Sequence, residues 1–182
     1  MKKIYFISRN KEKIKEVISL FENTNIEIIP YNIKIEEIQS SDVNAIIKDK
    51  ALKAFSQIGR PVIVEHSGLL LEKLNYKLPN GLTQEFWDSL EADKFSQLFG
   101  DQKAKAFTII GYIDGKKLHT FKGEIEGIII NEPRGCRAFH WDCVFIPNNY
   151  EETFAEMGTQ KKNEISMRKQ AFDLLLKHFE YE

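Results

Sequence analysis

The chain has 182 residues, of which 42% are hydrophobic and 29% charged, and its formal net charge is −1 at pH 7. This length suits one domain, residues 1–182, with a substantial buried core. The near-zero net charge excludes a general electrostatic attraction to nucleic acid or to a membrane surface. Any anion site must therefore be a local cluster of basic groups.

Two further features bear on location. The apolar stretch from Ile4 to Ile7 is too short for a signal peptide, and no run approaches the roughly 18 apolar residues of a membrane span. The cysteines, Cys136 and Cys143, lack CxxC spacing and a second pair that could complete a zinc site, which is typical of reduced thiols. We expect a cytoplasmic protein without nucleic-acid or membrane partners.

The first half of the chain alternates apolar strand patterns with helical ones. Strands are expected over residues 2–8, 26–30 and 61–65. Asn10 can cap a first helix and Asp42 a second, and residues 80–100 are expected to be helical in two pieces. The strand over 61–65 ends in a polar cluster.

Antiparallel strands dominate the second half. Residues 106–113, 117–122 and 124–130 predict a β-meander, with a hairpin turn at Asp114-Gly115. One more short strand is expected over 143–146 and a last helix over 164–179. Early strand–helix alternation followed by antiparallel strands predicts an α/β protein with a mixed sheet.

The turn from the first strand into the first helix is a candidate anion site. Its sequence is Ser8-Arg9-Asn10-Lys11-Glu12-Lys13. Free backbone N–H groups at a helix start attract anions, and Lys13 lies about one turn into the helix. The segment lacks the glycines of a P-loop, so an ordinary capped helix is the alternative interpretation.

The polar cluster after residues 61–65 is a second candidate site. It reads Glu65-His66-Ser67-Gly68-Leu69, and the carboxyl end of a strand in an α/β sheet is a common place for ligands. Histidine acts as a general base near neutral pH. The alternative is that His66 is an ordinary residue at a strand end.

Three motifs in the last third of the chain resemble the signature of the inosine triphosphate pyrophosphatase family, F-G-(Y/W)-D, T-(F/Y)-A-E-M and E-K-N-x-I-S-H-R. They are Phe139-His140-Trp141-Asp142, Thr153-Phe154-Ala155-Glu156-Met157 and Lys162-Asn163-Glu164-Ile165-Ser166-Met167-Arg168. The spacing of Ser8, Asn10, Lys13 and Glu16 resembles the family's (T/S)-x-N-x-x-K-x-x-E, and Glu65 to Leu69 resembles (D/E)-D-(S/T)-(G/C)-L.

The resemblance implies a fold and an activity. The expected fold is α/β, with a central mixed sheet, flanking helices and two lobes around a cleft, and the protein would be a homodimer. The expected activity is that of a metal-dependent nucleoside-triphosphate pyrophosphatase acting on ITP, dITP and XTP. Two alternatives stay open: a nucleotide-binding protein without turnover, and a hydrolase for a different modified nucleotide.

The resemblance also implies roles for individual residues. Glu37, Glu65 and His66 would hold a divalent cation, Mg²⁺ or Mn²⁺, and His66, Glu65 and Lys48 would be catalytic. The expected substrate-binding residues are Ser8, Arg9, Asn10, Lys11, Glu12, Lys13, Lys48, Ser67, Phe139, His140, Trp141, Asp142, Lys162, Met167 and Arg168. Among these, Phe139 can stack on a purine ring.

Five positions depart from the family pattern. His66 replaces the expected catalytic Asp, His140 a Gly, Cys143 a Pro, and Met167 a His that would donate a hydrogen bond to the base. Glu85 stands where some relatives carry a Lys. Imidazole is a poorer ligand than carboxylate for Mg²⁺ and a better one for Mn²⁺ or Zn²⁺. His66 therefore leaves three alternatives. It could act as the general base together with a metal other than Mg²⁺, or as the general base beside a metal held only by Glu37 and Glu65, or the catalytic activity could be lost.

Overall fold

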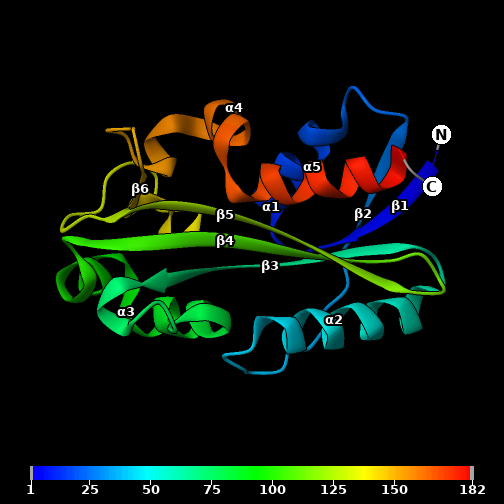
Figure 1. Cartoon of the computed structure of the whole chain (residues 1–182), viewed down its shortest axis with the longest axis horizontal. Helices are drawn as coiled ribbons and strands as arrows, with labels where there is room; N and C mark the ends of the chain where they lie inside the picture. Colours follow the sequence, from blue (N-terminus) through cyan, green and yellow to red (C-terminus); the bar gives the residue numbers. More distant parts are fainter. Residues whose placement is uncertain (1, 181–182) are drawn as a thin grey trace.

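The architecture of the chain, in a computed structural model that describes residues 2–180, is a six-stranded mixed sheet between two layers of helices (Figure 1). The strand order is β2-β1-β3-β4-β5-β6, with β1 parallel to β2 and β3 and the other neighbours antiparallel. The strands are β1 (Lys2–Ile7), β2 (Ile26–Tyr31), β3 (Val62–Leu71), β4 (Gln102–Ile113), β5 (Leu118–Ile129) and β6 (Phe145–Pro147). The predicted mixed α/β sheet is confirmed.

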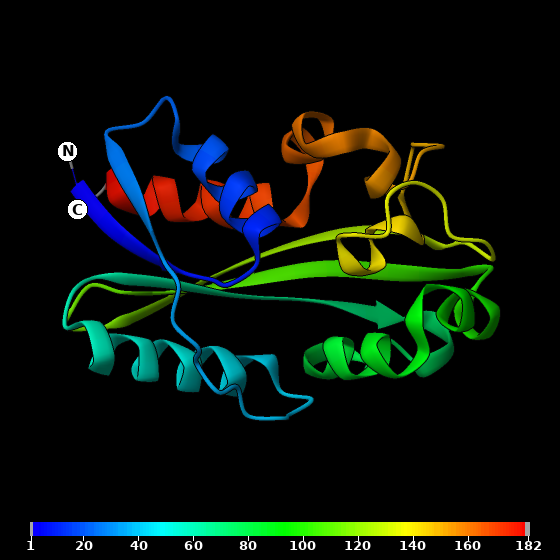
Figure 2. The ribbon, with the colours of Figure 1, turned by 180° about the vertical axis from the view of Figure 1, so that it is seen from behind.

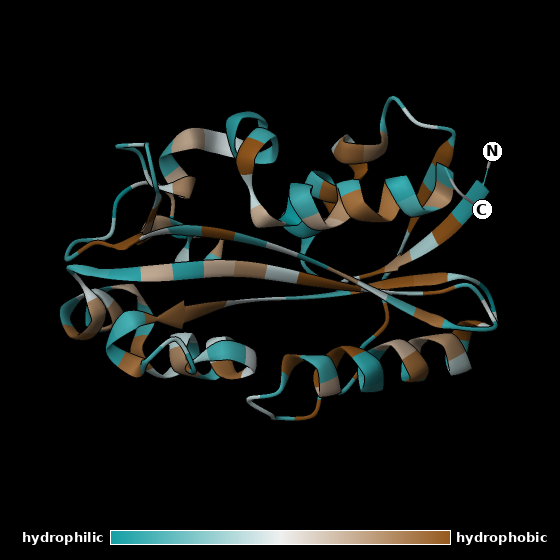
Figure 3. Cartoon of the chain, in the orientation of Figure 1, coloured by the Kyte–Doolittle hydropathy of each residue, from teal (hydrophilic) through white to brown (hydrophobic). Residues whose placement is uncertain are grey.

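Helices cover both faces of this sheet (Figures 1 and 2). One face carries α1 (Lys11–Phe21), α4 (Phe154–Ile165) and α5 (Met167–Glu180), and the other carries α2 (Val43–Ile58) and α3 (Thr83–Phe99). Three short 3₁₀ helices, η1 (Glu72–Leu74), η2 (Asn80–Leu82) and η3 (His140–Cys143), connect them. In Figure 3, α2 and α5 alternate hydrophobic and hydrophilic residues, the pattern of helices that pack one face on a sheet.

The alternation of side chains along β3 divides the core into two layers. Val62 and Val64 pack with α2, whereas Ile63 packs with residues of α1 and α5 such as Phe172. Successive side chains of a strand point to opposite faces of a sheet. Glu65 therefore faces the layer of α1 and α5, and His66 faces the layer of α2 and α3.

Local capping explains where the predicted helices begin. The Asn10 side chain accepts hydrogen bonds from the backbone N–H groups of Glu12 (3.0 Å) and Lys13 (3.2 Å), and Asp42 accepts one from Asn44 (2.9 Å). Both predicted caps are confirmed. The predicted two-piece helix is also confirmed, because α3 has a kink at Glu91.

Two strand predictions were wrong in extent. The strand predicted over residues 61–65 continues to Leu71 and pairs with β4 down to Ala104, so the polar cluster lies within a strand and not at its end. The strands predicted over 117–122 and 124–130 form one strand, β5. Gly123 is not a turn: a Cβ there would lie 1.9 Å from the carbonyl oxygen of Met167, so this glycine permits close packing of α5.

The C-terminal elements shift slightly from their predicted bounds. The predicted helix over 164–179 begins at Met167, because Ser166 is extended (φ −68°, ψ 157°) and separates α4 from α5. The strand expected over 143–146 is found as Phe145–Pro147. Cys136 and Cys143 are both free thiols, as predicted. Within residues 2–180, none of the helices combines the length and apolar composition that crossing a membrane requires.

Candidate active site

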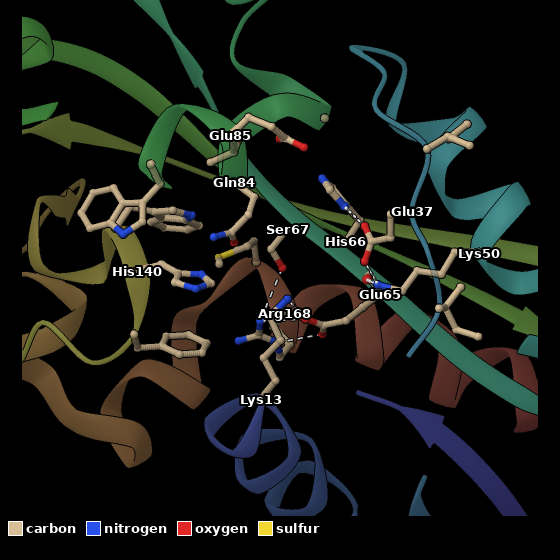
Figure 4. A pocket seen from close by; sticks show the side chains of 18 of the residues that line it. Lys13, Glu37, Lys50, Glu65, His66, Ser67, Gln84, Glu85, His140 and Arg168 are labelled. Carbon is tan, nitrogen blue, oxygen red and sulfur yellow. Dashed lines mark hydrogen bonds and ion pairs between the residues drawn. The ribbon is translucent and has the colours of Figure 1, made fainter. Parts of the chain in front are cut away.

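A cavity of about 560 Å³ opens beside the middle of β3 (Figure 4). The parallel pairing of β1 with β3 stops at Phe6 and Ile63, so the cavity occupies the space beyond the carboxyl end of β1. Its walls come from α1, the segment 34–38, α2, β3, η2, α3, η3 and the start of α5.

On the face of α1 and α5, Glu65 is the centre of a buried charge cluster (Figure 4). Arg168 donates to both carboxylate oxygens of Glu65 at 2.9 Å and also donates to Glu16, while the ammonium of Lys13 lies 2.9 Å from Glu65. Burial alone would raise the pKa of Glu65, but the charges of Arg168 and Lys13 outweigh it and hold this pKa well below its usual range. Glu65 is therefore an ionised, fully paired acid.

The same cluster continues to the aromatic side of the cavity. The Lys162 ammonium lies 3.0 Å from Glu16 and 2.5 Å from Asp142, and 4.0 Å from the centre of the Phe139 ring. Burial raises the pKa of Asp142 to about 6, despite the opposing charge of Lys162. Three acids and three basic groups thus join α1, β3, η3, α4 and α5: Glu16, Glu65, Asp142, Lys13, Lys162 and Arg168.

On the opposite face, His66 pairs with Glu37. The two atoms Nδ1 of His66 and Oε2 of Glu37 are 3.2 Å apart, and Lys50 donates to the other oxygen of Glu37 (2.5 Å) and to the backbone carbonyl of Glu65 (3.0 Å). Burial would raise the pKa of Glu37, but His66 and Lys50 lower it to about 2. An ionised carboxylate only accepts, so a neutral His66 carries its proton on Nδ1 and its lone pair on Nε2.

Two acceptor atoms in this part of the cavity lack a hydrogen-bond partner among the described residues. They are Nε2 of His66, whose residue is only 9% exposed, and Oε2 of Glu85. Both residues line the cavity. Figure 4 shows the carboxylate of Glu85 and the imidazole of His66 directed toward one another.

Most of the predicted site residues lie together. Those that line the cavity are Lys13, Glu37, Glu65, His66, Ser67, Phe139, His140, Trp141, Asp142, Met167 and Arg168. Lys162 lines a neighbouring cavity of about 320 Å³ that shares Phe139 and Asp142 with the first. The motif residues of the C-terminal third thus converge on the polar part of β3, as expected.

The predicted phosphate loop contributes less than expected. Only Lys13 lines the main cavity, and Glu12 lines the neighbouring one. Ser8 accepts a hydrogen bond from the backbone N–H of Asn10 (3.2 Å), so these two residues shape the turn. Arg9 and Lys11 are exposed on the surface and are absent from the lining of both cavities.

The structure brings a different lysine of α2 to the cavity from the one that was predicted. Lys48 is exposed and does not line the cavity, whereas Lys50 does. Two residues correspond to about 200° around a helix, which places Lys48 and Lys50 on different sides. The sequence contains a signal that Lys50 lies on the inner side of α2, because position 50 continues the helical spacing of the buried residues Ile46, Ile47 and Ala54.

The predicted three-ligand metal site is not assembled. Glu65 and His66 point to opposite faces of the sheet, and both oxygens of Glu65 are taken by Arg168 and Lys13. Over residues 2–180, no three or more His, Cys, Asp or Glu side chains are placed to hold a metal ion together. Glu37 and His66 do meet, but through a hydrogen bond.

Two of the departures from the family pattern have visible structural consequences. His140 has φ +44°, a left-handed conformation that glycine adopts without strain, and its ring is parallel to that of Phe139. Burial lowers the pKa of His140, and the nearby charge of Lys13 adds to this effect. Met167 is 1% exposed and offers the cavity an apolar surface without a donor.

The cavity has cationic groups on one side and an aromatic ring on the other. The chain is thus an α/β protein whose cleft suits a phosphorylated aromatic ligand. The chain belongs to the Ham1 family, whose model matches residues 4–178. The family membership that its motifs predict is confirmed.

Solved structures and curated relatives agree with this assignment. A HAM1 protein from Coxiella burnetii has a TM-score of 0.82 and 28% identity over 100% of both chains. The Staphylococcus aureus Ham1 protein shares the fold, with a TM-score of 0.74, 22% identity and 98% coverage of both chains. Among curated relatives, a dITP/XTP pyrophosphatase of Ignicoccus hospitalis is 33% identical over 97% of this chain and 96% of its own length. A second, from Saccharolobus solfataricus, is 34% identical over 93% and 90%.

Proposed function

We propose that this protein is a nucleoside-triphosphate pyrophosphatase for non-canonical purine nucleotides such as ITP, dITP and XTP. It would cleave between the α- and β-phosphates, releasing a nucleoside monophosphate and pyrophosphate. The observation that carries the proposal is a cleft with cationic and aromatic walls, in a chain that matches dITP/XTP pyrophosphatases along nearly its whole length.

The phosphate chain is assigned to the side of the cleft that carries Lys13 and Lys50. Both ammonium groups line the cavity and are held in place by carboxylates, Lys13 by Glu65 and Lys50 by Glu37. Phosphoryl transfer depends mainly on positioning and on neutralising charge at the phosphate oxygens. Lys50 takes the role that was predicted for Lys48, and the turn from Ser8 to Asn10 positions the start of α1.

The base is assigned to the aromatic side. A purine stacking on Phe139 would meet the cations that now lie over that ring, Lys162 at 4.0 Å and Arg168 at 5.6 Å from its centre. Asp142 and Lys162 offer an acceptor and a donor for the edge of the base. Met167 offers neither, so discrimination between bases rests on fewer polar contacts than the family pattern implies.

His66 is the group we assign to the reacting centre. His66 lines the cleft, and its Nε2 has no hydrogen-bond partner among the described residues, whereas both oxygens of Glu65 are paired with Arg168. His66 is therefore able to accept a proton or bind a cation, and Glu65 is not. A divalent cation would supply further charge neutralisation when bound. Glu37, Glu65 and His66 do not form a joint three-ligand site for such a cation, because both oxygens of Glu65 are paired with Arg168.

A specific observation keeps a second function open. His66 stands where the family pattern has its catalytic acid, and a cleft of this kind could bind a nucleotide without hydrolysing it. A panel of nucleotides, each with Mg²⁺, Mn²⁺ and Zn²⁺, assayed for pyrophosphate release distinguishes the possibilities. Turnover of ITP supports the proposal. Binding of nucleotide without turnover supports the second function, and turnover of another nucleotide alone indicates a different substrate.

The single domain over residues 1–182, the homodimer and the cytoplasmic location stay predictions. Sedimentation of the purified chain tests the homodimer. A monomer at micromolar concentration would contradict it.

A further inference from the structure

One of the acidic side chains that line the main cavity has no cationic partner. The five acidic residues of the lining are Glu36, Glu37, Glu65, Glu85 and Asp142. Four of them lie 3.9 Å or less from a lysine or arginine nitrogen, and Glu85 is the exception. Within residues 2–180, the Glu85 side chain takes part in no ion pair and accepts no hydrogen bond. Its carboxylate is therefore available to a ligand in the cavity.

The surroundings of Glu85 do not supply the donor that it lacks. Its Oε2 atom is shielded from water, and Figure 4 shows the carboxylate directed toward the imidazole of His66. A neutral His66 carries its proton on Nδ1, which lies 3.2 Å from Glu37, so its Nε2 offers a lone pair and not a donor. The neighbouring Gln84 donates its amide to Asp88 at 2.6 Å. A carboxylate that has lost part of its hydration is stabilised by a ligand that donates to it.

Glu85 lies where the sugar of a bound nucleotide would pass. The proposed function assigns the base to Phe139 and the phosphate chain to Lys13 and Lys50. In the view of Figure 4, Glu85 lies between His140, which marks the aromatic side of the cavity, and Lys50. The sugar joins the base to the phosphate chain, so it must cross this middle part of the cavity.

The sugar hydroxyls are the donors that a nucleotide offers at this place. Phosphate oxygens carry negative charge near neutral pH and are repelled by a carboxylate. The N–H groups of the purine edge are assigned to Asp142. The 2′- and 3′-hydroxyls remain, and an acidic side chain that accepts a hydrogen bond from a ribose hydroxyl is a recurring arrangement in nucleotide-binding folds.

We propose that the Glu85 carboxylate accepts hydrogen bonds from the neighbouring 2′- and 3′-hydroxyls of the nucleotide's ribose, so that the cleft favours ribonucleotides over 2′-deoxyribonucleotides. The inference rests on the proposed function for the presence of a nucleotide in the cleft. Among the proposed substrates, ITP and XTP are thus preferred to dITP. Glu85 is a specificity-determining residue that contacts the sugar and takes no part in the bond that is broken.

The test compares kcat/KM for ITP and for dITP in the native chain and in Glu85→Ala. The native chain should favour ITP by about tenfold or more, the effect of one hydrogen bond to a charged group. In Glu85→Ala the preference should fall to about threefold or less, because the variant has no acceptor for the 2′-hydroxyl. A change of charge or of folded fraction alters both substrates alike, so the ratio reports the contact with the hydroxyl.

Two further variants control this experiment. Glu85→Gln keeps the shape of the side chain and a neutral acceptor oxygen, so its preference for ITP should lie between those of the native chain and Glu85→Ala. Glu36→Ala is the matched control, because Glu36 lines the same cavity but its side chain is 84% exposed, and its ratio should equal that of the native chain. Equal ratios of ITP to dITP in the native chain and in Glu85→Ala overturn the proposal.

Binding measurements separate this inference from the proposed function. Pyrophosphate release from ITP with a ratio that Glu85→Ala leaves unchanged would overturn the sugar contact alone. In a chain that releases no pyrophosphate, calorimetry should still show tighter binding of ITP than of dITP and the loss of this difference in Glu85→Ala. That result would support the sugar contact and contradict the activity, whereas a chain that binds neither nucleotide would contradict both.

Discussion

Replacing Glu65 by Gln removes the charge at the centre of the buried cluster while nearly preserving its shape. In the native chain, Glu65 is 2% exposed and accepts two hydrogen bonds of 2.9 Å from Arg168, which is itself 1% exposed. Lys13 adds a third contact of 2.9 Å. With a neutral amide at position 65, Arg168 would keep only its ion pair with Glu16. Lys13 would lose the carboxylate that it contacts.

The expected cost is large because the partner charges stay buried. Breaking a buried ion pair by removing one member typically costs about 3–5 kcal/mol. In a domain of this length each kcal/mol lowers the thermal midpoint by roughly 2–4 °C, so Glu65→Gln should lower it by roughly 6–20 °C. Glu36→Gln, at a carboxylate whose side chain is 84% exposed, should change the free energy of unfolding by less than about 0.5 kcal/mol.

Urea denaturation at several pH values measures this effect. The folded-state pKa of Glu65 lies below its unfolded value, so its stabilising contribution is present above the unfolded pKa of about 4.3 and is lost as the pH falls below it. The difference between native chain and variant should therefore be full at pH 7 and shrink below about pH 4. A Glu65→Gln variant within about 1 kcal/mol of the native chain at pH 7 would refute the importance of this cluster.

Three further predictions concern the walls of the cleft. Lys50→Ala should weaken nucleotide binding by about 1.5–3 kcal/mol in calorimetry, whereas Lys48→Ala should not; equal effects would contradict the exchange of roles between these lysines. His140→Gly should raise the free energy of unfolding by about 1 kcal/mol in urea titration, because glycine relieves a left-handed backbone at some cost in chain entropy; a clear loss of stability would contradict it. Met167→His should increase the preference for ITP over ATP and GTP, in kcat/KM, by up to about tenfold, since it restores one donor. A strict ITP preference of the native chain that this variant leaves unchanged would contradict the role of Met167.

Sequence patterns predicted the elements whose causes are local. The caps at Asn10 and Asp42 act over two or three residues, and the helices begin where these side chains predict. The prediction of two strands on either side of Gly123 was wrong, because this glycine does not form a turn. It makes room for the backbone of Met167, which is distant in the sequence. Likewise β3 continues past its polar residues because β4 pairs with it as far as Ala104, a contact that a local pattern does not contain.

The motifs predicted which residues meet in the cleft better than they predicted what each one contacts. Glu65 and His66 are adjacent in the sequence and were grouped in one metal site, but a strand that continues through them sends their side chains to opposite faces. Lys50 could have been chosen over Lys48 from its place on the buried stripe of α2. The unpartnered atoms of His66 and Glu85 depend on how α3 packs on β3, which the sequence alone does not give.

Phosphorus magnetic resonance of ITP incubated with the native chain and Mn²⁺ tests the central claim most directly, because it identifies the bond that is broken. The account predicts one inosine monophosphate and one pyrophosphate per ITP, without inosine diphosphate or free phosphate. Inosine diphosphate and phosphate as products, or intact ITP with both the native chain and His66→Asp, would contradict a pyrophosphatase in this cleft.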